Sequence, residues 1–264
     1  MTVGFIGTGN MGGALARSVA KSGCEVLLCN RSAAKAEALA GELGARVCDN
    51  ETAAWESDFL FLGVKPQGMA EMLSPLKSVL TARETPCVLV TMAAGLTIAD
   101  IREMTVGACP VIRIMPNTAC AVGKSMTLYC CSDNVMPELR DDFLHLMAAS
   151  GEMESLDEKL IDAGSAVAGC GGAYACLFME GLADGGVAIG LPRAKALRFA
   201  QQMLLGTAAL AMESGDHPGE LKDAICSPGG TTIAGVRALE ARGFRSAAME
   251  AVIAAYERTM ELKK

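Results

Sequence analysis

The sequence is poor in the residues on which metal sites and nucleic-acid surfaces depend. It has only two histidines, His145 and His217, and its eleven cysteines include no C-x-x-C pair. No metal site is therefore predicted. Lysine and arginine form no run, and 23 basic against 30 acidic residues leave a net charge of −7, which argues against a nucleic-acid partner.

Long uncharged stretches are scarce as well. The most membrane-like stretch, Ala163–Met179, is short for a span, holds four glycines and lies between Asp162 and Glu180. We expect a buried helix there and no membrane partner. No export signal is recognised, and an odd number of cysteines is typical of a reducing compartment. We therefore expect a cytoplasmic protein whose thiols pack as small apolar groups.

The first thirty residues contain a glycine turn between a strand and a helix. Val3–Ile6 is an apolar run of strand formers, Gly7–Gly12 has the pattern G-x-G-x-x-G, and Glu25–Cys29 has the composition of a second buried strand. This order is that of a dinucleotide-binding βαβ unit, in which the glycines permit a tight turn, a close approach to a pyrophosphate and close helix packing. The helix start then offers free N–H groups to the phosphates. The alternative is a glycine-rich turn in an ordinary α/β domain. The predicted cofactor contacts in this turn are Gly7, Thr8, Gly9, Asn10, Met11 and Gly12.

The end of the second strand indicates which dinucleotide binds. NAD sites usually place an acidic residue there, whereas this chain has Asn30, Arg31 and Ser32. Arg31 offers a permanently charged fork suited to a phosphate, and Ser32 opens a helix whose N–H groups add donors. We therefore predict a preference for NADPH. The alternative is a helix cap beside a solvated arginine, with NADH accepted as well.

Strand and helix patterns alternate up to about residue 155, and only helical patterns follow. We therefore predict a Rossmann-type, doubly wound α/β domain over residues 1–155 and an all-helical domain of five or so helices over residues 156–264. One helix is expected from Met69 to Leu80, where apolar residues recur at helical spacing.

Ligands on open α/β sheets bind beyond the carboxyl ends of the strands. Apolar runs that end at Val64, Thr91 and Met115 place three more loops at that edge. A solvated charge is the alternative reading for Lys65. The further residues predicted at the cofactor are Val64, Lys65, Pro66, Gln67, Ala93, Ala94, Gly95 and Asn117.

The helix expected around residues 169–190 is unusual because it contains seven glycines and four alanines. Each interior glycine costs about 1 kcal/mol of helix propensity relative to alanine. Small residues let helices approach closely, so we expect this helix to be buried against others. A domain of about a hundred residues can hardly enclose it, and we infer a dimer in which the helical domains interlock.

A second turn with exposed donors is predicted at Ser227–Thr232. Ser-Pro-Gly-Gly ends one helix and Thr231-Thr232 begins the next, which gives a helix N-terminus with two glycines and hydroxyl groups alongside. Such a turn suits an anion the size of a carboxylate. The alternative is simply a well-capped helix.

With these motifs in place, the whole chain resembles the pyrroline-5-carboxylate reductases, which make proline. The most specific part of the likeness is the family signature over Leu221–Glu240. A departure lies at Ala168–Tyr174, where the family usually has two more hydroxyl groups and a proline. The other matching stretches are Phe5–Gly12, Asn30–Ser32, Val64–Gln67, Ala93–Gly95, Arg113–Thr118, Glu180–Val187, Gly190–Arg193 and His217–Gly219.

The resemblance implies that the sheet-end loops hold NADPH and that the Ser227–Thr232 turn holds 1-pyrroline-5-carboxylate. The substrate carboxylate would take the N–H groups of Gly229, Gly230 and Thr231, with help from Ser227. A hydride would pass from the nicotinamide to the imine carbon, and the Thr232 hydroxyl would orient the ring nitrogen. In that family the turn meets the cofactor domain at a dimer interface, and dimers often assemble into a decamer.

Two other functions are compatible with parts of this pattern. β-Hydroxyacid dehydrogenases share the domain plan but need a lysine and an asparagine one turn apart on a central helix. No lysine occurs between Lys159 and Lys195, and no asparagine follows Asn134, so that chemistry is not expected. A catalytically inactive, nucleotide-sensing dimer is the other alternative, and a turnover assay distinguishes it.

Overall fold

The computed structural model describes residues 1–105, 107 and 109–262. Contacts divide the chain into two compact units. Unit 1 comprises Met1–Cys170 together with the C-terminal segment from Ala255, and unit 2 comprises Gly171–Ala254. Each unit is described by itself.

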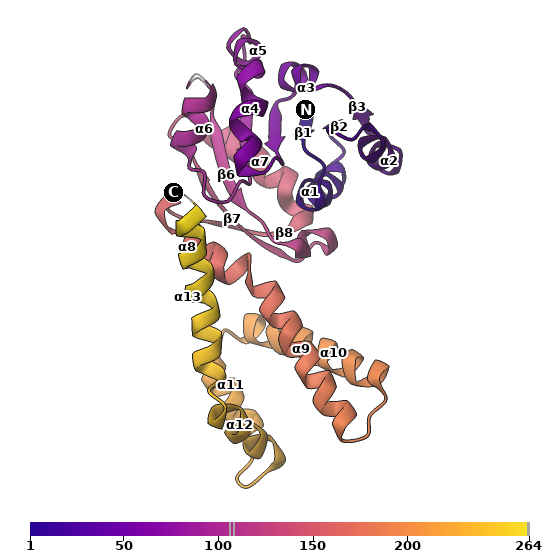
Figure 1. The fold of residues 1–264 in the computed structure, drawn as a ribbon, viewed down its shortest axis with the longest axis vertical. Coiled ribbons are helices and arrows are strands. Elements are labelled where there is room, and N and C mark those ends of the chain that lie inside the picture. The colour runs from indigo at the N-terminus through magenta and orange to yellow at the C-terminus, as the bar shows by residue number, and fades with distance from the viewer. Residues whose placement is uncertain (106, 108, 263–264) are drawn as a thin grey trace. The chain divides into compact units, whose positions relative to one another are not determined.

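Unit 1 is built on one eight-stranded sheet in the order β3-β2-β1-β4-β5-β6-β7-β8 (Figure 1). All neighbouring strands are parallel except β6 and β7, which are antiparallel. The chain runs outward from β1 in one direction and returns to the other side of it at β4. The predicted Rossmann-type, doubly wound sheet is confirmed. The strands are β1 (Thr2–Ile6), β2 (Glu25–Cys29), β3 (Arg46–Val47), β4 (Phe59–Leu62), β5 (Val88–Thr91), β6 (Val111–Met115), β7 (Ser125–Cys131) and β8 (Gly151–Ser155).

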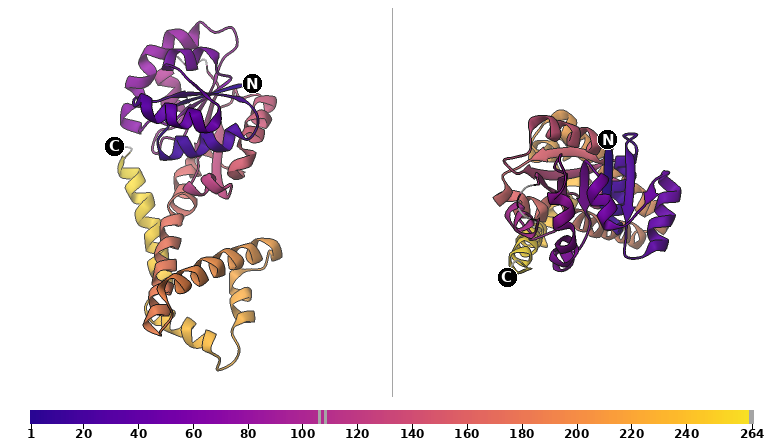
Figure 2. Two further views of the ribbon diagram at one scale, coloured as in Figure 1. Left: turned by 90° about the vertical axis from the view of Figure 1, so that its right-hand side faces the viewer. Right: turned by 90° about the horizontal axis from the view of Figure 1, so that it is seen from above.

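Helices cover both faces of this sheet (Figure 2). Successive strand side chains point to opposite faces, so β1 and β4 each supply two cores. On one face Phe5 and Phe61 stack at 4.5 Å between ring centroids, beneath α1 (Asn10–Ala20), α2 (Ala33–Leu43) and α7 (Pro137–Met147). On the other face Leu60 and Leu62 pack against α3 (Asn50–Glu56), α4 (Met69–Leu73), α5 (Lys77–Thr81) and α6 (Ile98–Thr105).

The helix predicted from Met69 to Leu80 is broken in the structure. Helices α4 and α5 are separated by a 3-10 turn over Ser74–Leu76. Pro75 lies in that turn, and proline removes a backbone donor and clashes with the preceding helical turn. The apolar periodicity persists across the break because both short helices face the same core.

Strands end at β8 near the predicted boundary at residue 155, but unit 1 continues to Cys170. The next helix, α8 (Glu158–Ala168), packs against β7, and its Ile161 is fully buried in the unit 1 core. A buried ion pair between Asp162 of α8 and Arg113 of β6 strengthens this attachment. The compact units therefore divide after α8 rather than before it.

Unit 2 is entirely helical. A side-chain Cβ at Gly186 of α9 would lie 3.0 Å from the Cβ of Ala196 on α10, so small residues do permit a close helix contact. The Tyr174 hydroxyl donates to the Ala251 carbonyl at 3.0 Å, and Phe178 packs against Phe244. The helices of this part of the chain are α9 (Gly171–Ala188), α10 (Arg193–Ser214), α11 (Pro218–Ile225), α12 (Thr231–Ala241) and α13 (Phe244–Leu262), of which α13 continues into unit 1.

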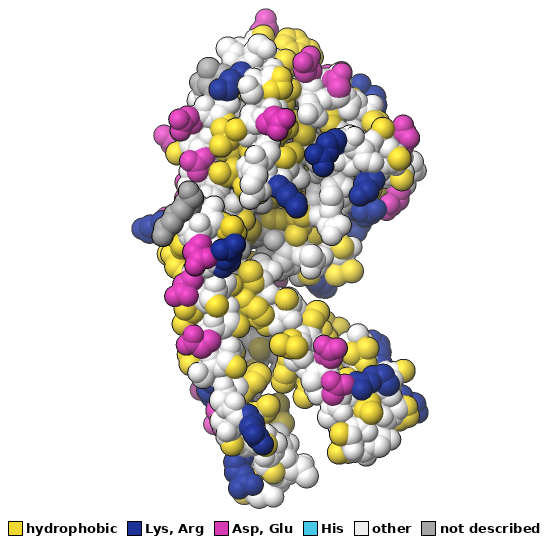
Figure 3. Space-filling view, viewed as in Figure 1, with side chains coloured by type: hydrophobic (Ala, Val, Ile, Leu, Met, Phe, Trp, Pro, Cys, Tyr) yellow, Lys and Arg dark blue, Asp and Glu magenta, His cyan; other side chains and the backbone are white. Residues whose placement is uncertain are grey.

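The expectation that the apolar helix around residues 163–179 is buried does not hold within one chain. Of the residues of α9, only Ala183 is buried. The helical stretch Glu158–Ala188 is long and apolar enough to cross a membrane by length and composition alone. Its 18-residue apolar window has a mean hydropathy of 1.3, and 11% of that window is buried. Core helices of soluble proteins pass the same test, so this is weak evidence for a span. Figure 3 shows hydrophobic side chains on the surface of these helices.

Candidate functional site

The turn after β1 brings three glycines against backbone atoms. Gly7 has a φ of +97°, and its N–H donates to the Cys29 carbonyl at 2.8 Å. A Cβ at Gly12 would lie 2.1 Å from the Gly7 carbonyl oxygen, and one at Gly63, just after β4, would lie 2.2 Å from the same atom. Gly7 and Gly63 therefore bring the ends of β1 and β4 together at the point where the strand order reverses, the usual ligand position in such sheets.

Gly9 differs from the neighbouring glycines because its side of the turn is open. Apart from its two neighbours in the chain, a Cβ there would meet no atom of the described residues within 4 Å. Gly9 is the N-cap of α1, the first turn of α1 has no acidic residue, and no side chain caps it. The N–H groups of this first turn lack intrahelical acceptors by helix geometry. The turn thus offers donors and open space to an anion.

The Thr8 side chain adds an observation of its own. Its Oγ1 is buried and has no hydrogen-bond partner among the described residues. Buried hydroxyl groups are normally hydrogen-bonded, so this orphan fits a turn whose remaining partner is a ligand. Open space at Gly9, free donors and an unpaired hydroxyl together fit a dinucleotide diphosphate.

The tip of β2 carries a free cation. Arg31 is exposed and has no ion-pair partner in the part of the chain that the structure describes, whereas Arg17 and Arg46 are both paired with carboxylates. Ser32 is the N-cap of α2 but its hydroxyl makes no capping hydrogen bond, and the first turn of α2 has no acidic residue. Both side chains are therefore available to a phosphate group.

Two further loops follow the carboxyl ends of β4 and β5. Lys65 is exposed and precedes a 3-10 turn at Pro66–Gly68. Ala93 is buried, Ala94 is exposed, and Gly95 has a φ of +82°. The parallel pairing of β2, β1, β4 and β5 places these loops and the glycine turn along one edge of the sheet, as predicted from the strand ends.

Asn117 is less available than the sequence suggested. Its Oδ1 accepts from the Ala119 N–H at 3.0 Å, and its Nδ2 donates to the Ala168 carbonyl at 2.9 Å. These bonds fix the loop after β6 and attach it to the end of α8. A cofactor contact from this amide would require one of them to break.

The predicted substrate turn has the expected position in unit 2. Helix α11 ends at Ile225, Gly229 has a φ of +67°, and α12 begins at Thr231 with Gly230 as its N-cap. No acidic residue lies in the first turn of α12. Ser227, Gly229, Thr231 and Thr232 are all exposed within one chain.

One predicted donor needs correction. The Gly230 N–H donates to the Ser227 carbonyl at 3.0 Å and so closes the turn itself. This N–H is therefore not free for a carboxylate. The first-turn N–H groups of Thr231 and Thr232 lack intrahelical acceptors and, with the hydroxyls of Ser227 and Thr232, remain as candidate donors.

Sequence reasoning missed a buried charge network in unit 1. Arg113 is only 1% exposed, and its Nη2 lies 2.7 Å from the Asp162 Oδ1 and its Nη1 3.5 Å from the Glu158 Oε1. The Glu158 Oε1 also accepts from the Ile98 N–H at 2.6 Å. An arginine within the apolar strand Val111–Met115 was the available signal, since a buried charge needs a partner.

The cysteines are all free thiols, and several are core residues. Burial raises the pKa of the Cys87 thiol to about 12 and, with a contribution from Glu158, that of Cys130 to about 12. Thiols of this kind stay protonated and unreactive at neutral pH. Among residues 1–105, 107 and 109–262, no group of three or more His, Cys, Asp and Glu residues could hold a metal ion.

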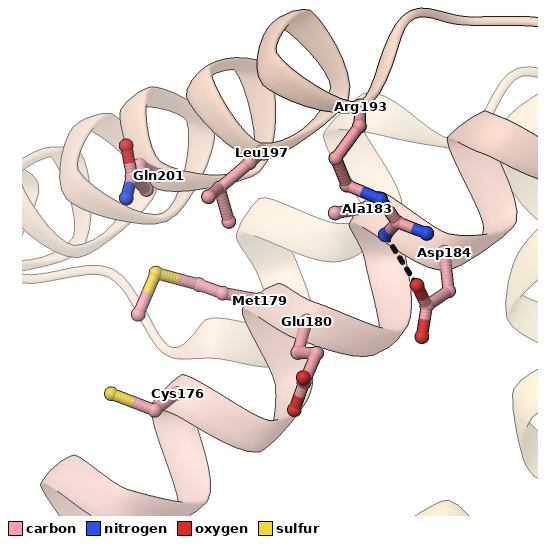
Figure 4. Close-up of a pocket in the computed structure, with 8 residues that line it drawn as sticks. All are labelled: Cys176, Met179, Glu180, Ala183, Asp184, Arg193, Leu197 and Gln201. Carbon is pink, nitrogen blue, oxygen red and sulfur yellow. Dashed lines mark hydrogen bonds and ion pairs between the residues drawn. The ribbon is translucent and has the colours of Figure 1, made fainter.

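A hollow of about 550 Å³ lies between α9 and α10, and none of its lining residues is a predicted site residue (Figure 4). Arg193 bonds to Asp184 at its rim, while Glu180 and Cys176 extend from α9. It has mixed apolar and charged walls. The lining residues are Cys176, Met179, Glu180, Ala183, Asp184, Arg193, Leu197 and Gln201.

Comparison with known proteins finds relatives that match this chain over almost its whole length. Residues 158–262 match the family described as pyrroline-5-carboxylate reductase dimerisation, and residues 2–95 match the family described as NADP oxidoreductase, coenzyme F420-dependent. The chain is 40% identical to the pyrroline-5-carboxylate reductase of Arabidopsis thaliana, over 99% of this chain and 95% of that protein. It is 39% identical to that of Methanosarcina acetivorans, over 99% and 98%. The crystal structure of Plasmodium falciparum pyrroline carboxylate reductase with NADP bound is similar, with a TM-score of 0.90, 30% identity, and coverage of 100% of this chain and 98% of that one.

Proposed function

The chain belongs to the pyrroline-5-carboxylate reductase family, and on that premise we propose which of its residues hold the two ligands. It is an oxidoreductase that uses NADPH to reduce 1-pyrroline-5-carboxylate to proline. The bound coenzyme supplies the hydride. The residues of this chain bind and orient the two ligands.

The turn Gly7–Gly12 holds the coenzyme diphosphate. The observation that carries this assignment is the open space at Gly9 beside the free first-turn donors of α1. Arg31 and Ser32 hold the ribose phosphate, which distinguishes NADPH from NADH, and NADH is accepted less well. Val64–Gln67 and Ala93–Gly95 line the same edge of the sheet and contact the remainder of the coenzyme.

The Ser227–Thr232 turn holds the substrate carboxylate. Its donors are the Thr231 and Thr232 N–H groups and the Ser227 hydroxyl, with the backbone at Gly229 leaving room for close approach. The positive end of α12 favours a negative charge at this point. A carboxylate held there presents the rest of the small ring in a fixed orientation, and positioning of this kind lowers the barrier to hydride transfer.

Thr232 orients the imine nitrogen through its hydroxyl. An ordinary threonine is a poor acid, so Thr232 positions the ring and water supplies the proton. Thr232→Ala should lower kcat about tenfold or more, the size of effect expected when an orienting hydrogen bond is lost. NADPH affinity should not change, because the coenzyme contacts lie elsewhere.

The test follows NADPH oxidation on addition of pyrroline-5-carboxylate and measures NADPH binding separately by fluorescence. Thr232→Ser is the matched control because it keeps the hydroxyl group. A Thr232→Ala enzyme with unchanged kcat would remove this residue from the mechanism. The same assay distinguishes an enzyme from an inactive nucleotide sensor, since a sensor would bind NADPH without oxidising it.

The chain forms homo-oligomers through its helical part. We propose that the basic unit is a dimer, that dimers assemble further into a decamer, and that the apolar helices are covered by partner chains and not by lipid. We also propose a cytoplasmic location, which eleven free thiols support. Sedimentation without detergent and cell fractionation test these points. Detergent-dependent solubility or recovery with membranes would contradict them.

A further inference from the structure

His217 closes the first turn of helix α11. Its Nδ1 accepts a hydrogen bond from the Gly219 N–H at 3.0 Å, and its carbonyl accepts from the Glu220 N–H at 2.8 Å. Pro218 follows at the first helical position. A Cβ at residue 219 would lie 3.0 Å from the same ring nitrogen, so the glycine leaves room for this contact.

Histidine is an unusual residue for this position. Ser, Thr, Asp and Asn are the preferred N-caps, and their side-chain oxygens can accept a hydrogen bond over the whole neutral range. An imidazole nitrogen accepts only while it is unprotonated. Histidine is also the side chain that ordinarily changes charge between about pH 5 and about pH 8.

Helix α11 depends strongly on this cap. It has eight residues, about two turns, and none of them is buried within one chain. Isolated helices this short are marginal in water because nucleation is costly. Within one chain, losing the first turn should therefore loosen the second as well.

The far end of α11 leads directly into the proposed substrate turn. The Cys226 N–H donates to the Asp223 carbonyl at 3.1 Å, and Ser227 then begins the turn closed by the Gly230 N–H. The order of α11 therefore fixes one end of the Ser227–Thr232 segment, and α12 fixes the other.

We propose that His217 is a positioning residue for this reaction, which holds the substrate turn in place through α11 and releases it when the imidazole is protonated. This inference rests on the proposed role of the Ser227–Thr232 turn. In a protonated ring Nδ1 carries a hydrogen, so it can no longer accept the hydrogen bond from the Gly219 N–H. The ring also places a positive charge at a helix N-terminus, where it is unfavourable.

Charged groups lie on both sides of His217 in the chain and at the far end of α11. Arg245 of α13 lies close enough to Lys222, in the last turn of α11, to act on it electrostatically. The titratable groups beside His217 are those of its own segment, Asp216 before it and Glu220 in the first turn.

The experiment measures steady-state kinetics of the full-length enzyme between about pH 8 and about pH 5.5. His217→Asn keeps a good cap that does not titrate, and His217→Ala removes the cap. As the pH falls, the KM for pyrroline-5-carboxylate should rise in the wild type about fivefold more than in His217→Asn. A factor of about five corresponds to the typical free energy of one N-cap. His217→Ala should show the raised KM at every pH, and the KM for NADPH should be the same in all three proteins.

The comparison between variants cancels the ionisation of the substrate, which is common to all of them. Amide hydrogen exchange of the peptide 216–226 is a second readout. After correction for the intrinsic effect of pH on exchange, this peptide should lose protection at low pH in the wild type but not in His217→Asn. An active wild type whose pH dependence is the same as that of His217→Asn overturns the role of His217 alone. A wild-type KM for pyrroline-5-carboxylate at pH 8 in both Ser227→Ala and Thr231→Pro, each of which removes a proposed carboxylate donor, would instead overturn the proposed substrate turn, and this inference with it.

Discussion

Arg31 presents an exposed guanidinium, with no ion pair to any described residue, at the end of β2, where the ribose of a dinucleotide is expected. Charge-assisted hydrogen bonds to a phosphate contribute about 1.5–3 kcal/mol. Arg31→Ala should therefore raise the KM for NADPH by about tenfold to a hundredfold and leave the KM for NADH nearly unchanged. The measurement is the ratio of kcat/KM for the two coenzymes at low and at high salt.

Arg31→Lys is the control for charge without the planar fork, and it should recover only part of the preference. The preference should also weaken as ionic strength rises, because exposed charges are screened. An unchanged NADPH-to-NADH ratio in Arg31→Ala would mean that another residue recognises the phosphate.

Residues differ in how far the sequence alone predicts their roles. The roles of Gly7 and Gly12 could be predicted because the glycine motif, the strand before it and the helix after it are all adjacent in the sequence. The partners of Arg113 could not, because Asp162 lies 49 residues further on and no local spacing connects the two. Asn117 had a suitable position at a strand end, yet its amide bonds to Ala168, a contact that only the packing of α8 reveals.

Alanine substitutions in the β1–α1 turn distinguish a glycine needed for packing, Gly12, from a glycine needed for ligand binding, Gly9. At Gly12 the new Cβ would lie 2.1 Å from a backbone oxygen, and at Gly9 it would meet nothing. We expect Gly12→Ala to cost about 3 kcal/mol of unfolding free energy, as overpacking does. Gly9→Ala should cost no more than about 1 kcal/mol, the loss of N-cap preference.

NADPH affinity should show a different pattern. Gly9→Ala places its methyl group where we propose that the diphosphate lies, so its NADPH dissociation constant should rise by about tenfold or more, equivalent to about 1.4 kcal/mol. Urea unfolding without coenzyme and titration with NADPH measure the two effects separately. A stable Gly9→Ala protein that binds NADPH normally would place the diphosphate elsewhere.

Elements were predictable where one pattern dominated, as in the buried parallel strands β1, β2, β4 and β5. Breaks within an apolar pattern were harder. The apolar periodicity from Met69 to Leu80 predicted one continuous helix, although Pro75 breaks it in the structure. Helix α11 has eight residues and no residue buried within one chain, so its bounds could not be predicted from apolar periodicity. Its cap is identified only by the hydrogen bond that the His217 side chain accepts.

Helix α9 is largely exposed in one chain, and we propose that it is buried only in the assembled oligomer. Within one chain only Ala183 of this helix is buried, and large apolar side chains such as Leu177 and Leu205 are 71% and 61% exposed. Single chains rarely expose so much contiguous apolar surface in water. Association in the dimerisation family explains both the exposure and the glycine-rich composition, because small residues let partner helices approach.

Stability should consequently depend on protein concentration. If folding is coupled to association, each tenfold increase in concentration stabilises the folded state by about 1.4 kcal/mol per association step. The midpoint of thermal unfolding should then rise by about 2–4 °C per tenfold increase for a chain of this size. Scanning calorimetry over a dilution series, with sedimentation at the same concentrations, measures this directly.

A pair of charge substitutions localises the effect. Leu205→Glu introduces a carboxylate on α10 and should shift the protein toward dissociated chains with a lower unfolding midpoint, because an unpaired charge would have to be buried at the interface. Val122→Glu is the matched control, since Val122 is 73% exposed but lies in unit 1. It should leave both the sedimentation coefficient and the concentration dependence unchanged. Equal effects from the two substitutions would contradict an interface built on the helices of unit 2.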